Sequence, residues 1–261
     1  MATLARYRRL EARHALGRAP LVGLVAGLAL LVATQIVMPL VPAPAIGLLE
    51  QAFRVRGLGA VVLLNDYLAL STVLFFVGVS QLLQVIVAPR EERQLDLLLT
   101  KPIAPATFLA ARTTPVLIST GVLGAILSVG CALAMLPYEA AGADGTALGA
   151  FGAGLVVTAA TILQLAAVNV VFLRISDGFA ALMVAFIVWV LPLLPASAFI
   201  YRPDLFDGSA ALTTALVAPA NLLWHDGAMP IVAAVGLLVA GVASATLVRL
   251  GGWTLGRMDL R

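Results

Sequence analysis

The chain contains several uninterrupted apolar stretches that are long enough to cross a lipid bilayer as helices. A spanning helix needs about 20 predominantly apolar residues, and every backbone polar group inside the bilayer must be paired within the protein. Hydrophobic residues make up 62% of the 261 residues and charged residues only 11%, so lipid must surround most of the surface. A transmembrane barrel would instead show short segments of alternating polarity. We therefore predict an all-α membrane protein with a single domain over residues 1–261.

The apolar runs predict six membrane-spanning helices. They cover about residues 20–42, 64–88, 106–136, 147–173, 178–200 and 229–250. The first run is longer than a signal-peptide core, so we interpret it as a retained span. Residues 1–19 predict an amphipathic interfacial helix, with a solvated basic tail as the alternative. Residues 43–63 predict an external segment with an interfacial helix, and residues 201–228 a re-entrant or interfacial pair at the outer face.

The distribution of basic residues predicts the orientation. Of the 16 lysines and arginines, all but Arg54, Arg56 and Arg202 lie on the same side as the N-terminus. Cytoplasmic loops carry the excess of positive charge, so both termini are expected in the cytoplasm. Lys101 is the only lysine, and this bias toward arginine hints at a GC-rich bacterial genome. We therefore expect a multi-pass protein of the bacterial cytoplasmic (inner) membrane.

Residues 90–112, between the second and third predicted spans, are the most informative about function. Glutamates near the start and a lysine near the end of residues 91–101 suit a helix dipole, and three leucines share one face opposite a polar face. The charged ends are Glu91 and Glu92 at the start and Lys101 at the end. The apolar face carries Leu95, Leu98 and Leu99, and the polar face carries Arg93, Asp96 and Thr100. Such a short amphipathic helix can dock into a groove on a cytosolic partner, or it can rest on lipid headgroups. The residues alone leave both uses open.

The run from Glu92 to Pro102, ERQLDLLLTKP, resembles the first cytoplasmic loop of type 2 ABC transporter permeases. The usual form there is close to E-R-E-x-G-T-L-E-x-L-L-x-x-P; this chain lacks the Gly-Thr pair and is shorter before the leucines. The resemblance implies that residues 91–101 form a coupling helix that contacts a cytosolic ABC ATPase subunit. It also implies a chain that is half of an exporter, paired with a second permease copy or a paralogue. ATP and Mg would then lie on the partner ATPase, with no cofactor on this chain.

Other motifs are absent. A phosphate-binding P-loop needs a lysine after glycine, whereas Lys101 is followed by Pro102 and has no glycine nearby. His14 and His225 lie on opposite predicted sides, so a histidine metal site or a Ser-His pair cannot form within one chain. We therefore expect no enzymatic activity, no metal site and no nucleic-acid partner. No predicted span has an acidic residue at its centre, which argues against a proton-coupled carrier.

The uncharged polar residues inside the spans have two interpretations. Gln84, Gln164 and Asn169 are candidates to line a translocation path, although such groups more often bridge helices. Gly23 and Gly27 form a small-xxx-small pair that permits close helix contact, and Cys131 is expected to be a small buried hydrophobe. The scarcity of intramembrane charge favours an apolar or amphipathic cargo. A non-transporting membrane scaffold or assembly factor, and a secondary carrier, remain the alternative functions.

Overall fold

All regular secondary-structure elements in the part of the chain that the structure describes are helices. The structure, a computed structural model, covers residues 17–53, 57–92, 104–142, 146–191 and 229–256 in describable form. Its elements are α2 (Ala19–Val37), η1 (Met38–Leu40), α3 (Ala43–Phe53), α4 (Gly57–Leu82), η2 (Leu83–Val87), α5 (Ala88–Glu91), α7 (Pro105–Ala140), α8 (Ala147–Phe172), α9 (Gly178–Val190) and α12 (Met229–Leu255). Here η1 is a 3₁₀ turn and η2 a π-helical turn.

Five helices in the described residues are long and apolar enough to cross a membrane. They run over Ala19–Leu40, Gly57–Glu91, Pro105–Ala140, Ala147–Phe172 and Ile231–Leu255. The 13 residues of α9 extend only about 20 Å, which is less than the hydrocarbon core of a bilayer. The predicted span 178–200 continues beyond residue 191, outside the described residues, and so does the predicted segment 201–228. The protein is therefore a multi-pass helical membrane protein, and the count of six spans stays a prediction.

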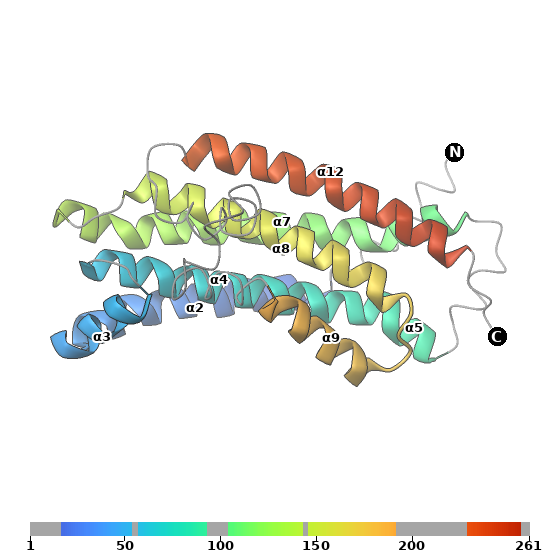
Figure 1. Ribbon diagram of the computed structural model, residues 1–261, viewed down its shortest axis with the longest axis horizontal. Helices are drawn as coiled ribbons and strands as arrows, with labels where there is room; N and C mark the ends of the chain where they lie inside the picture. The colour runs from blue at the N-terminus through green and yellow to red at the C-terminus, as the bar shows by residue number, and fades with distance from the viewer. Residues whose placement is uncertain (1–16, 54–56, 93–103, 143–145, 192–228, 257–261) are drawn as a thin grey trace, which may run out of the picture.

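The long helices lie side by side along the long axis of the molecule (Figure 1). Helix α8 packs against α12, α7 and α4, while α2 packs against α4 and α7. Helix α8 is central because it carries no charged residue and is rich in small residues that allow close approach. Helix α9 lies against α8, α4 and η2, near the end of the bundle where α5 ends.

Large apolar side chains cover the outside of the bundle. Ile118 on α7 is 61% exposed, and Ile231 and Leu238 on α12 are 73% and 67% exposed. A water-soluble chain rarely leaves a contiguous apolar surface of this kind uncovered. The bilayer is the solvent that makes these faces stable.

Close contacts of α2 depend on the predicted glycine pair. A Cβ atom at Gly27 would lie 2.6 Å from Cδ1 of Leu127 on α7, and one at Gly23 would lie 2.7 Å from Cγ2 of Val77 on α4. Carbon atoms do not approach so closely, so a larger residue at either position would force the Leu127 or Val77 side chain to shift. The small-xxx-small prediction is confirmed, and the Cys131 side chain is buried in the same contact region, as expected.

Short polar turns set the helix starts after α7 and α8. The Thr146 hydroxyl oxygen accepts from the Gly149 N–H at 3.0 Å and caps α8, and the Asp177 carboxylate accepts from the Ala180 N–H at 2.7 Å and caps α9. These caps satisfy N–H groups that have no partner inside the helix. The sequence placed both helix starts correctly, at 147 and 178.

Helix α4 begins earlier than the sequence predicted, at Gly57 rather than at residue 64. The Glu50 carboxylate accepts from the Gly57 N–H at 2.8 Å, and the apolar run after Gly57 continues directly into the helix. The predicted external segment 43–63 is thus divided between α3 and the start of α4. As a consequence Asn65 and Asp66, predicted to mark the start of the span, lie inside a membrane-spanning helix.

Candidate functional site

Most of the predicted coupling residues lie outside the described residues. This holds for Arg93, Leu95, Asp96, Leu98, Leu99 and Lys101. Glu91 and Glu92 are described and are exposed at the end of α5, where the Glu92 N–H donates to the Ala88 carbonyl oxygen at 3.0 Å. Pro89 does not begin a separate helix, because α4, η2 and α5 run on continuously through it. The chain keeps one long helix from Gly57 to Glu91.

A buried arginine joins the two helices that flank this segment. Val85 lies in the π-turn η2, and Pro89, four residues later, has no N–H to donate to the Val85 carbonyl. The Arg112 guanidinium from α7 donates to this Val85 oxygen at 2.9 Å and lies 4.7 Å from the centre of the Phe108 ring. Arg112 is only 9% exposed. From the sequence, Arg112 was predicted only to be one of the cytoplasmic positive charges. The signal that could have indicated its role is Pro89, which lies one helical turn after Val85.

Two further polar contacts hold α7 against its neighbours near the same end of the bundle. The Thr113 hydroxyl donates to the Asn169 Oδ1 of α8 at 3.2 Å, and the Ser119 hydroxyl donates to the Gln81 Oε1 of α4 at 3.3 Å. Asn169 and Gln81 are both fully buried. Asn169 therefore bridges helices in this structure, and it lines neither of the two grooves that follow.

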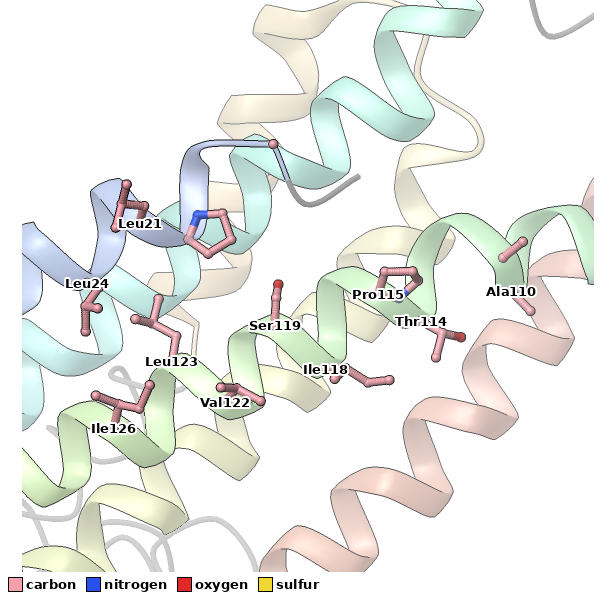
Figure 2. A pocket seen from close by; sticks show the side chains of 13 residues that line it. Leu21, Leu24, Ala110, Thr114, Pro115, Ile118, Ser119, Val122, Leu123 and Ile126 are labelled. Atoms are coloured by element: carbon pink, nitrogen blue, oxygen red, sulfur yellow. The ribbon is translucent and has the colours of Figure 1, made fainter. Parts of the chain in front are cut away.

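A groove of about 930 Å³ lies between the start of α2 and the first half of α7 (Figure 2). Leu21 and Leu24 of α2 lie opposite Leu123 on α7. The lining is largely apolar, and side-chain oxygens come only from Thr114 and Ser119. The volume matches that of small-molecule sites, which are typically about 300–1,000 Å³. Because its wall residues are exposed on the outer surface of the bundle, the groove opens sideways toward lipid.

Pro115 gives this groove a polar backbone group as well. It lies inside α7 and has no N–H, so the Ala111 carbonyl lacks its α-helical donor. Ala111 and Pro115 both line the groove. The groove can bind the apolar chain of an amphipathic molecule along its leucines. The Thr114 and Ser119 hydroxyl groups and the Ala111 carbonyl can then bind the polar end of the same molecule.

A second groove, of about 580 Å³, lies between α2 and α4. Gln84, a predicted path-lining residue, is exposed there together with Arg18, and the half-buried Ser80 also lines the groove. Gln164, another candidate, is half-buried and its Nε2 lies 3.5 Å from the Val188 carbonyl oxygen of α9. The three polar candidates thus occupy separate places, and of the three only Gln84 lines a described groove.

A third polar cluster lies between α2 and α4 at the opposite end of α4. The Asn65 Nδ2 donates to the Thr34 hydroxyl oxygen at 2.7 Å, and the Thr34 hydroxyl donates to the Leu30 carbonyl at 3.0 Å. The neighbouring Asp66 is 0% exposed. This site was not predicted, because Asp66 lies near the start of the predicted span 64–88 rather than at its centre.

Comparisons with protein families, with curated proteins and with solved structures each found no match. Among the described residues there is no group of three or more His, Cys, Asp or Glu side chains that could hold a metal ion.

Proposed function

We propose that this chain is the membrane subunit of an ATP-driven ABC exporter in a bacterial cytoplasmic membrane. It would work with cytosolic ABC ATPase subunits, which carry ATP and Mg, and with a second permease copy or a paralogue. The observation that carries the proposal is the pairing of Arg112 with Val85, which joins the two helices on either side of the motif that resembles a permease coupling loop. The resemblance of residues 92–102 to a permease coupling loop supplies the identity of the partner.

The proposed coupling is mechanical. Helix α5 ends at Glu91 and α7 begins at Pro105, so a force on the residues between them acts on both long helices. Because Arg112 of α7 pairs with the carbonyl of Val85, the two cytoplasmic ends would move together. Val85 itself belongs to the π-turn η2, and such turns are frequent at functional sites in helices. It would serve as the bending point between the coupling end and the remainder of α4.

The groove between α2 and α7 is the proposed cargo surface. Its apolar walls and sideways opening suit a lipid-like or amphipathic molecule that enters from the bilayer. The chain itself would perform no chemistry, because ATP hydrolysis by the partner supplies the free energy and the helices switch access between the two sides. The proposal of a lipid-like or amphipathic cargo rests on the groove, and the motif at residues 92–102 does not indicate a cargo.

Purification of the tagged chain from its native membrane tests the proposal. We expect a P-loop ATPase to copurify, and ATP hydrolysis in reconstituted vesicles to depend on both proteins. Leu98→Ala should lower this activity more than Asp96→Ala, because apolar anchors dominate such interfaces and exposed charges contribute little. A scaffold would copurify with proteins that hydrolyse no ATP, and a secondary carrier would transport cargo without any ATPase. Either outcome would contradict the proposal.

A further inference from the structure

Asp66 is a buried carboxyl group in the middle of apolar packing. It is 0% exposed, and neither carboxyl oxygen accepts a hydrogen bond from the described part of the chain. An isolated carboxylate in a dry interior is unfavourable by several kcal/mol, and ionisable groups inside membrane helices are functional in most proteins that have them. Asp66 can therefore be stable in this position only with a bound proton, a bound cation or a nearby positive charge.

The position of Asp66 is close to the outer end of the bundle. It lies nine residues from the start of α4, or about 13 Å along the helix. Asp66 projects from α4 toward α2 and α7, where Thr34 is its neighbour and Cys131 and Tyr138 lie within its electrostatic range. With the predicted orientation this depth is near the external boundary of the hydrocarbon core. Small helix movements there would be enough to admit external water.

Thr34 of α2 is a polar neighbour of Asp66, but its hydroxyl group is engaged with other partners. It donates to the Leu30 carbonyl oxygen and accepts from the Asn65 amide. Neither Asp66 carboxyl oxygen has a hydrogen-bond partner among the described residues.

No counter-charge is available from the described residues of the helices packed around Asp66. Helix α8 carries no charged residue, and Arg18 lies at the opposite end of α2. Arg112 of α7 is paired with Val85, which is 19 residues from Asp66 along α4, or about 28 Å. The remaining charge on α7 is Glu139, which is itself acidic and accepts from the Ala147 N–H at 2.8 Å.

We propose that Asp66 is a proton-binding site, occupied when α2, α4 and α7 are packed as in this structure. When α2 separates from α4, the carboxyl group meets external water and releases its proton; when the helices close, it takes one proton from that water. No other bond is made or broken. Proton binding and helix packing are therefore linked, whichever transport function the chain has.

Two carbodiimides test the site. Dicyclohexylcarbodiimide partitions into apolar regions and reacts with protonated carboxyl groups, whereas a water-soluble carbodiimide with glycine amide reacts with carboxyl groups that water can reach. In the folded protein at neutral pH, peptide mass spectrometry should find Asp66 modified by the apolar reagent only. Exposed Glu91 should show the opposite pattern and is the matched control. Asp66→Asn should fold normally, since a neutral amide replaces a neutral acid, and should lose the label completely.

Three results would overturn the proposal. Absence of apolar-reagent labelling at Asp66 would mean that the carboxyl group is ionised. Protection of Asp66 from that reagent by Na⁺ or K⁺ would assign a cation site instead. Failure of Asp66→Asn to insert, with Asp66→Glu inserting, would show that a neutral group cannot occupy the site. Thr34→Ser should keep the labelling of wild type, because the serine hydroxyl preserves the hydrogen bonds to Leu30 and Asn65.

Discussion

Replacement of Arg112 by methionine should destabilise the end of the bundle where α5 ends and α7 begins. The change removes a charged donor from the Val85 carbonyl and a cation that lies 4.7 Å from the Phe108 ring centre. Loss of a hydrogen bond to a charged group costs about 1.5–3 kcal/mol, and the cation–π contact adds about 1 kcal/mol. Relief from burying a charge offsets part of this loss. We expect a net decrease of about 2 kcal/mol in the free energy of unfolding.

The origin of this effect can be isolated through Pro89. Pro89→Ala supplies an N–H that donates to the Val85 carbonyl once η2 takes α-helical geometry, so Arg112→Met should cost about 1 kcal/mol less in that background. Reversible unfolding in mixed detergent micelles, followed by circular dichroism, measures all four proteins of the cycle. Arg249→Met, the same change at an exposed position of α12, is the control and should stay within about 0.5 kcal/mol of wild type. An equal cost of Arg112→Met in both backgrounds would refute the role assigned to the missing Pro89 N–H.

Three further predictions concern packing, capping and topology. Gly27→Leu should separate α2 from α7 and destabilise the protein by at least about 1–3 kcal/mol in the same unfolding assay, since a Cβ there already meets Leu127 at 2.6 Å; wild-type stability would contradict the observed contact. Asp177→Ala removes the cap of α9 and should cost about 1 kcal/mol, with Asp177→Asn nearly neutral, and equal losses in both variants would exclude capping as the cause. In a Cys131→Ala background, cysteine at 142 should react with an impermeant external reagent, and reaction of cysteine at 94 from outside would reverse the predicted topology.

The sequence predicted the spanning helices well because the apolar runs are long and their limits are polar. Helix α8 was placed at 147–173 and is observed over Ala147–Phe172, since Thr146 caps it. The end of the third span was placed at residue 136, but α7 continues to Ala140 because Pro137 is tolerated near the end of the helix. Apolar patterns therefore identify a span but not its last turn.

The candidate sites were harder to predict because they depend on contacts between helices distant in sequence. Arg112 is informative only once its position opposite Val85 is known, and the pairing joins residues 27 apart. Asp66 looked like a boundary residue because polar residues commonly mark the ends of spans. Its burial arises from Thr34 and from α7, which no pattern within α4 indicates.

Copurification of an ATPase with variants of residues 91–101 tests the central proposal most directly. Leu98→Asp and Leu99→Asp place a charge on the predicted apolar face, whereas Thr100→Asp adds the same charge to the predicted polar face and serves as the control. At matched membrane levels, we expect both leucine variants to lose the ATPase and ATP-driven transport, and the Thr100 variant to retain them. Undiminished copurification and activity in both leucine variants would show that this segment does not couple the chain to an ATPase, and would contradict the proposed function.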